Sequence, residues 1–237
     1  MKPFGFHEGD RSEFLAQFAF STIGYCVPVP RQFDRFGVDV IVHLFKRVGA
    51  NVAATGRAVA LQVKSDAGEL LIDSKEMRDC LYATSLPFLL AVVDKAEWRL
   101  DVYTTFLRLL AYWSNPDAAV RLVPGDKDGR AFPEDGSTIV FLGKPIASLR
   151  LADLEAEATK VETRDRLARV VNHWARWEQR HLDWRDDGVP FVASGPLRDR
   201  RTVQHTAYGD IDFLTVPDPG RLPAAGNSFA RTLTAMH

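Results

Sequence analysis

Hydrophobic and polar positions alternate in two neighbouring segments, 38–44 and 60–64. Side chains of a strand point alternately to its two faces, so each segment predicts a strand with one hydrophobic face. The hydrophobic residues of the first segment are Val38, Val40, Val42 and Leu44. A loop bounded by Gly49 and Gly56 favours a hairpin. This hairpin would gather Asp39, Gln62 and Lys64 on its other face.

Segments on both sides of this hairpin carry the periodicity of further helices and strands. Hydrophobic residues at helical spacing predict helices over 10–24, 74–85, 105–113 and 151–184, and Ser74 is the expected N-cap of the second. Strands are predicted over 25–30, 86–94, 98–104 and 138–142, the last at a sheet edge. The segment 86–94 is almost wholly apolar, which is typical of a strand covered on both faces.

Composition divides the 237 residues into three parts. Residues 1–115 hold an α/β core with elements in the order α-β-β-β-α-β, followed by one more strand. Residues 116–186 comprise a loop rich in Gly, Pro and Asp, the edge strand and the long helix, which we expect to pack on the core as a helical extension. Residues 187–237 are rich in Pro and Gly and predict a partly mobile arm.

Charge and composition limit the compartment and the partners. The formal net charge is −1, so nucleic-acid binding would depend on local clusters of Lys and Arg. The N-terminal segment carries acidic residues where a signal peptide needs an apolar core, and no run of about 18 uncharged apolar residues follows. Cys26 and Cys80 have neither disulfide nor metal-ligand spacing. We therefore expect a cytoplasmic protein that does not enter a membrane.

Two short motifs carry a resemblance to a known family. The tripeptides Gly37-Val38-Asp39 and Gln62-Val63-Lys64 resemble the motif of the PD-(D/E)xK nuclease superfamily, most closely its Mrr-like branch and bacterial domains of unassigned function with a G-x-D…Q-V-K-S signature. The resemblance covers residues 10–110 and implies a restriction-endonuclease-like core, with a mixed central sheet flanked by helices. Two features differ: the Pro-Asp dipeptide is absent, and Gln62 replaces the usual Asp or Glu.

The resemblance also implies a role for each motif residue. Asp39, the side-chain oxygen of Gln62 and the main-chain carbonyl of Val63 would bind Mg²⁺, with Mn²⁺ as a substitute, and these are the hard oxygen ligands that Mg²⁺ prefers. Lys64 would stabilise the attacking hydroxide and the charge that builds on the phosphorus. Glu13 has two interpretations: it completes a capping box with Asp10, or it supplies the extra carboxylate that Gln62 does not.

The long helix carries arginines for which three interpretations remain open. Arg164, Arg169, Arg176 and Arg180 are mixed with acidic residues, as on an ordinary solvated face. Alternatively they bind nucleic acid, with Trp177, His173, His181 and Trp184 packing on bases or sugars. A third alternative is dimerisation, because cleavage of both strands of a duplex would need a homodimer.

Four other groups of polar residues are weaker candidates for a site. Asp34 lies in a predicted turn, where aspartate is common, and His43 lies far along its strand from Asp39. The segment from Asp126 resembles the start of an EF-hand, but Ser137 stands at its closing position. His205, Asp210 and Asp212 lack the spacing of a metal site.

The sequence thus predicts a metal-dependent endonuclease that hydrolyses phosphodiester bonds of DNA, with bacterial defence as the context that the resemblance suggests. The alternative is a catalytically inactive protein of the same fold that binds nucleic acid or a protein partner. No Walker-type glycine run is present, which argues against nucleotide hydrolysis by that route.

Overall fold

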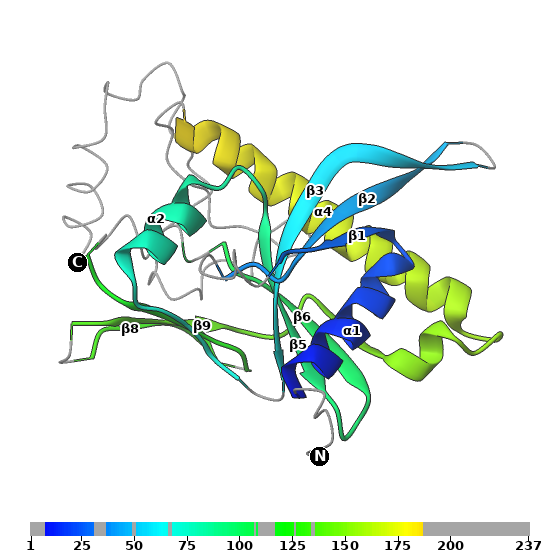
Figure 1. The fold of residues 1–237 in the computed structure, drawn as a ribbon, viewed down its shortest axis with the longest axis horizontal. Helices are drawn as coiled ribbons and strands as arrows, with labels where there is room; N and C mark the ends of the chain where they lie inside the picture. Colours follow the sequence, from blue (N-terminus) through cyan, green and yellow to red (C-terminus); the bar gives the residue numbers. More distant parts are fainter. Residues whose placement is uncertain are drawn as a thin grey trace, which may run out of the picture.

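The computed structural model describes residues 8–30, 37–48, 51–65, 68–106, 108, 117–125, 127–133 and 136–186. The chain is a mixed α/β protein (Figure 1). Its elements are α1 (Glu8–Ser21), β1 (Gly24–Pro28), β2 (Val40–Val48), β3 (Asn51–Ser65), β4 (Leu70–Ile72), α2 (Lys75–Ala83), β5 (Phe88–Asp94), β6 (Arg99–Thr104), β7 (Val120–Val123), β8 (Asp128–Ala131), β9 (Thr138–Leu142), β10 (Ala147–Arg150), the 3-10 helix η2 (Leu151–Leu154) and α4 (Lys160–Asp186).

A six-stranded sheet, here called sheet A, forms the centre of the molecule, with its strands in the order β1-β2-β3-β5-β6-β10. The strands β1, β2 and β3 are consecutive antiparallel neighbours. The chain then leaves the sheet through β4 and α2 and returns as β5, which is parallel to β3. The strand β6 pairs with β5 as the antiparallel neighbour that the sequence predicts.

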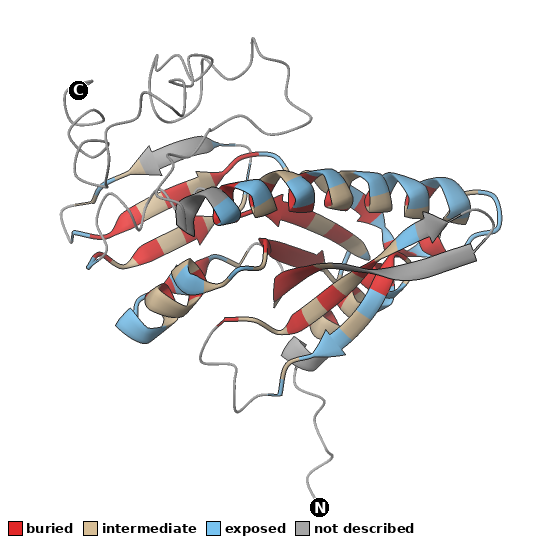
Figure 2. Ribbon diagram, turned by 90° about the horizontal axis from the view of Figure 1, so that it is seen from above, coloured by how far each residue is buried: buried red, intermediate tan, exposed pale blue. Residues whose placement is uncertain are grey.

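Each face of sheet A is covered by its own hydrophobic core (Figure 2). On one face, α1 and α4 pack against residues such as Val42, Leu61 and Val63. On the opposite face, α2 and the second sheet pack against Ala60 and Leu90. The strand β5 is buried on both faces, as its apolar sequence predicts.

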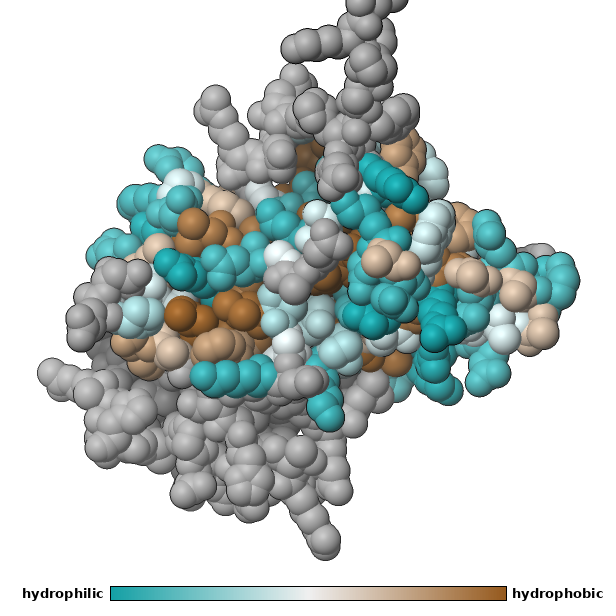
Figure 3. All heavy atoms as spheres, turned by 90° about the horizontal axis from the view of Figure 1, so that it is seen from below, coloured by the Kyte–Doolittle hydropathy of each residue, from teal (hydrophilic) through white to brown (hydrophobic). Residues whose placement is uncertain are grey.

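The second sheet, sheet B, has the order β4-β7-β9-β8. Its strands β7 and β8 lie in the segment expected to be a loop, and β9 lies between them instead of at an edge. Short strands in a Gly- and Pro-rich stretch give little local signal, because pairing with β9 is what stabilises them. Leu71 of β4 and Phe132, the residue after β8, are exposed. Figure 3 shows a hydrophobic patch on the side where Figure 1 places β8 and β9.

Several predicted elements differ from the structure at their ends. The helix α1 begins at Glu8, so Asp10 lies in its first turn and is not its N-cap. The predicted loop from Gly49 to Gly56 is mostly strand, because β3 begins at Asn51 and a register shift between His43 and Phe45 absorbs the extra residues. Ser74 caps α2 as predicted, accepting from the backbone N–H of Met77 at 3.1 Å.

The long C-terminal helix begins nine residues later than predicted, because η2 and a turn occupy 151–159. A buried ion pair holds α4 to sheet A: Arg108 Nη1 lies 2.7 Å from Glu178 Oε1, and the two side chains are 3% and 1% exposed. The same carboxylate oxygen accepts from the N–H of Phe88, the first residue of β5, at 3.1 Å. An acidic residue on the apolar stripe of α4 was the signal for this contact.

The remaining predictions fall outside the described residues. These are most of the helix over 105–113 and the arm over 187–237. Among the described helices, none is long and apolar enough to cross a membrane.

Burial of His181 on α4 gives folding a specific pH dependence. The imidazole lies 4.3 Å from the Trp177 ring, between centroids, and burial lowers the pKa of His181 to about 4. Between pH 6.5 and 4 the unfolded chain therefore takes up a proton that the folded protein does not. The free energy of unfolding should fall by about 3 kcal/mol over this interval because of this group.

Urea denaturation at pH 7, 5.5 and 4.5 tests this expectation against a His181→Leu variant. Carboxylate protonation affects both proteins alike, so the difference between them isolates the histidine. Parallel pH profiles for the two proteins would rule the contribution out.

Candidate functional site

The Asp39 carboxylate takes the place of a backbone acceptor where β2 and β3 separate. The main chain of Asp39 still pairs on both sides, donating to Leu61 O and accepting from Val29 N at 2.8 Å each. Beyond Leu61, Asp39 Oδ2 accepts from the N–H of Val63 at 2.6 Å. The side chain thus fixes the end of the hairpin, and its half-buried position in a β-rich segment is explained by this bond.

The amide of Gln62 lies against this carboxylate. Gln62 Nε2 donates to Asp39 Oδ2 at 2.5 Å and lies 3.4 Å from the carbonyl oxygen of Val63. The side chain is 6% exposed, so the amide needs these partners. One N–H₂ group therefore fills the space between a carboxylate oxygen and a main-chain carbonyl oxygen.

Gly37 makes room for the amide and for α2. Its φ is +66°, a left-handed conformation that favours glycine. A Cβ at this position would lie 2.3 Å from Met77 Cε and 3.2 Å from Gln62 Oε1. The sequence pattern predicted Val38 and Val40 on the same strand face. The left-handed backbone at Gly37 changes this alternation, so Val38 packs with the core on the Gln62 face and Val40 packs with the opposite core.

Lys64 lies two residues farther along β3, on the face that carries Gln62. Its side chain is half-buried, and within the described part of the chain it makes no hydrogen bond or ion pair. The strand therefore places this amine on the same face as the Gln62 amide, as the alternation in the sequence predicts.

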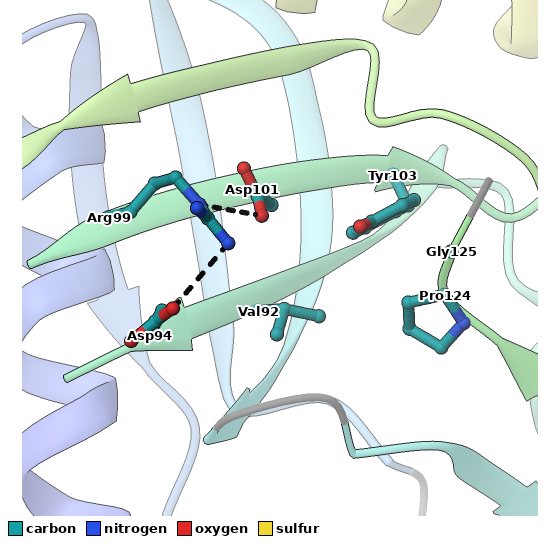
Figure 4. Close-up of a pocket in the computed structure, with 7 residues that line it drawn as sticks. All are labelled: Val92, Asp94, Arg99, Asp101, Tyr103, Pro124 and Gly125. Carbon is teal, nitrogen blue, oxygen red and sulfur yellow. Dashed lines mark hydrogen bonds and ion pairs between the residues drawn. The ribbon is translucent and has the colours of Figure 1, made fainter. Parts of the chain in front are cut away.

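A pocket of about 230 Å³ lies on the face of sheet A that carries Lys64, and its lining includes Val92, Asp94, Arg99, Asp101 and Tyr103 (Figure 4). The register places Lys64 next to Val92 of β5, and Val92 next to Asp101 of β6. In the pocket, Arg99 lies between two carboxylates, 3.1 Å from Asp101 Oδ2 and 3.5 Å from Asp94 Oδ2. Proximity to Asp101 raises the pKa of Arg99. The sequence analysis missed this pocket, although an aspartate inside a strand was a signal for it.

Part of sheet A beside Asp39 is open. Tyr25 and Val27 of β1 alternate with Cys26, which packs on the α1 side, and they are 63% and 37% exposed. His43 lies opposite Tyr25 in the register and is half-buried. A ligand could therefore approach Asp39 across β1 and β2.

Glu13 lies on α1, which packs against the opposite face of sheet A from Gln62 and Lys64. The buried side of α1 includes Ser12, Ala16 and Phe20, and Glu13 is half-buried beside it. The structure thus brings together Asp39, Gln62 and Val63, and Lys64 shares the strand face of Gln62. Glu13, by contrast, lies on the helix that covers the opposite face of sheet A.

The donor set of this cluster fits an oxygen-bound divalent ion by type. Asp39 Oδ2 and the Val63 carbonyl both lie near one point, which Gln62 Nε2 now fills. Binding would require the amide to turn its oxygen toward the ion. Among the described residues, no three His, Cys, Asp or Glu side chains are grouped closely enough to hold a metal. A single carboxylate is a weak site unless phosphate oxygens of a substrate complete it.

The remaining candidates have less support as parts of a site. Asp34, Asp126, His205, Asp210 and Asp212 lie outside the described residues. Cys26 and Cys80 are free, and burial raises the pKa of the Cys26 thiol to about 11, so it is a poor nucleophile at neutral pH. Of the rings predicted to stack on bases, His181 is buried, Trp177 is half-buried and His173 is exposed, and the side chain of Trp184 lies outside the described residues.

Comparisons of this chain with protein-family models, with curated proteins and with solved structures found no match.

Replacing Gly37 with alanine should destabilise the protein by more than its backbone conformation alone explains. The added Cβ would overlap Met77 and press on Gln62, and overpacking of this kind costs about 1–3 kcal/mol. Gly136 is a matched control, because its φ is +75° and nothing lies within 4 Å of its Cβ position.

Urea denaturation of Gly37→Ala and Gly136→Ala measures the two losses. We expect the larger loss for Gly37→Ala, by the overpacking term. Equal losses would contradict the close approach of α2 and β3 at this glycine.

Proposed function

We propose that this protein is a metal-dependent endonuclease that hydrolyses phosphodiester bonds of DNA. The observation that carries the proposal is the meeting of Asp39, Gln62 and the Val63 carbonyl at one point. Lys64 lies two residues from Gln62 on the same strand face and has no hydrogen-bond or ion-pair partner among the described residues. Carboxylate, amide and carbonyl oxygens suit Mg²⁺, and a nearby ammonium suits phosphate chemistry.

The arrangement of elements supports the same proposal. The chain runs through α1, three antiparallel strands, β4, α2 and a strand parallel to the third. Apart from β4, this succession resembles the α-β-β-β-α-β order expected of a restriction-endonuclease-like core. The short strand β4 departs from that order and belongs to sheet B. Fold alone does not imply activity, so the weight of the proposal falls on the residues.

Asp39 and Gln62 would hold and orient the Mg²⁺ ion that binds the phosphate of the substrate. The Val63 N–H fixes one oxygen of the Asp39 carboxylate, so the acid is positioned before a substrate arrives. Mg²⁺, when bound, would polarise a phosphoryl oxygen and lower the pKa of a water. Since one carboxylate balances only part of its charge, phosphate oxygens of the substrate are expected to help retain it.

Lys64 would act on the charge that builds during hydrolysis. Its ammonium has no hydrogen-bond or ion-pair partner among the described residues, so it would not have to break such an interaction to reach a substrate. Placed beside the attacking water, it would stabilise hydroxide and the negative charge on the phosphorus. The open face of β1 and β2 gives a DNA backbone a way to reach it.

One observation favours the inactive alternative, a nucleic-acid or protein binding module on the same fold. Gln62 donates to Asp39, so this pair also serves as an ordinary contact that joins the two strands. If that is its whole role, divalent ions do not bind and no cleavage occurs.

Asp39→Asn and Lys64→Met should each lower Mg²⁺-dependent nicking of supercoiled plasmid by at least about a hundredfold, the typical effect of removing one charge-stabilising group. The assay compares Mg²⁺, Mn²⁺ and EDTA by agarose gel. Circular dichroism would show that both variants remain folded.

Lys46→Met is the matched control, because Lys46 is an exposed lysine on the neighbouring strand β2. It should nick at the wild-type rate. Wild-type nicking by the Lys64→Met protein would refute the assignment, and no nicking by the wild type under any ion would favour the inactive alternative.

A further inference from the structure

Between positions 166 and 180, the only exposed side chains of α4 are basic. They are Arg166, Arg169, His173, Arg176 and Arg180. Steps of three and four residues place them on one side of the helix, over about 21 Å. Figure 2 shows α4 with an exposed side along its length. We call these five residues the basic stripe.

The acidic residues of α4 do not neutralise the basic stripe. Asp165 accepts from Arg164 at 3.2 Å, and Asp183 accepts from Gln179 at 3.0 Å. Glu178 is buried with its partner from sheet A. Arg169, Arg176 and Arg180 make no hydrogen bond or ion pair within the described residues, and Arg166 donates only to Ser148 O, at 3.4 Å. These four arginines therefore form no ion pair with any described residue, on a chain whose net charge is −1.

The stripe points away from the candidate site. The opposite side of α4, with Leu167, Val171 and Ala175, packs on the face of sheet A that carries Val63. Gln62 lies on the other face of the same strand, with the core that α2 and sheet B cover. Sheet A therefore separates the stripe from Asp39 and Lys64.

The side chains of the basic stripe indicate which class of anionic ligand fits it. Proteins that bind single strands add several aromatic platforms to their cations. On α4, Trp174, Trp177 and His181 pack on one another or on Phe106, which leaves His173 as the single exposed ring of the stripe. Lipid-binding helices insert apolar residues, and no exposed residue of 166–180 is apolar. A straight row of cations without either feature matches a rigid rod of phosphates, and a duplex carries one charge per about 1.7 Å of its axis.

We propose that the basic stripe binds the phosphate backbone of a nucleic-acid duplex without reading its sequence, on the opposite side of sheet A from Asp39 and Lys64. Phosphate contacts position a duplex but carry no sequence information. This binding is independent of cleavage and goes beyond the proposed nuclease activity: the full chain would hold duplex here even if the Asp39 cluster were inactive.

The test uses fluorescence anisotropy of a labelled 20-base-pair DNA duplex in EDTA, over a range of NaCl concentrations. Neutralising each phosphate contributes a slope of about −0.9 to log K against log salt. The triple variant Arg169→Gln/Arg176→Gln/Arg180→Gln should therefore reduce the slope by about 3 and weaken binding at low salt at least about tenfold. The loss should be the same for unrelated duplex sequences.

A second triple variant, Lys46→Gln/Lys127→Gln/Lys144→Gln, is the matched control. It removes the same net charge from exposed positions outside α4. We expect it to keep the wild-type slope, and thermal melting would show that both triple variants are folded. Both triple variants leave Asp39 and Lys64 intact, so a loss of binding in the α4 variant separates this proposal from the proposed nuclease.

Two results would overturn the proposal. The first is an unchanged salt slope in the α4 variant, or the same loss in the control. The second is a wild-type chain that binds vesicles with phosphatidylserine in preference to DNA and loses that binding in the α4 variant, since the occupant would then be an anionic lipid surface.

Discussion

The hydrogen bond from the Val63 N–H to the Asp39 carboxylate is the interaction on which this part of the molecule depends. It replaces the next backbone pair of the hairpin at the place where β2 diverges from β3. Without it, a buried backbone donor on a central strand would be left unpaired, which costs about 1–3 kcal/mol. The same carboxylate receives the Gln62 amide, so strand pairing and candidate chemistry share one oxygen.

The two faces of sheet A differ in the elements that cover them and in the polar groups that they carry. One face is closed by α1 and α4, and their outer surface carries the basic stripe. The other face is packed against α2 and sheet B, and it also carries Lys64, the pocket at Arg99 and the exposed Tyr25. For the proposed nuclease, this separation would let the protein bind a duplex on one face of sheet A and cleave phosphodiester bonds on the other.

Hydrophobic periodicity predicted much of the fold, because a long helix or strand repeats its hydrophobic spacing often enough to be recognised in the sequence. The hairpin, α1, α2 with its cap at Ser74, and the buried strand β5 all follow from such patterns. Sheet B was not predicted. Its strands other than β9 have four residues or fewer, and they are stabilised by pairing with strands that are distant in the sequence. The predicted strand face of Val38 was wrong, because β2 begins at Val40, after the left-handed backbone at Gly37. The convergence of Asp39 and Gln62 was predicted, but the direction of the amide depends on neighbours that the sequence does not reveal.

Thermal melting of Gln62→Glu, with and without Mg²⁺, tests the central claim most directly. Two carboxylates would then meet where Gln62 now donates to Asp39, so the variant should melt below the wild type in EDTA and recover with Mg²⁺, and adding Asp39→Asn should relieve the loss without metal. A Gln62→Glu protein that melts like the wild type in EDTA and does not respond to Mg²⁺ would contradict the claim that these side chains share one cation-sized position.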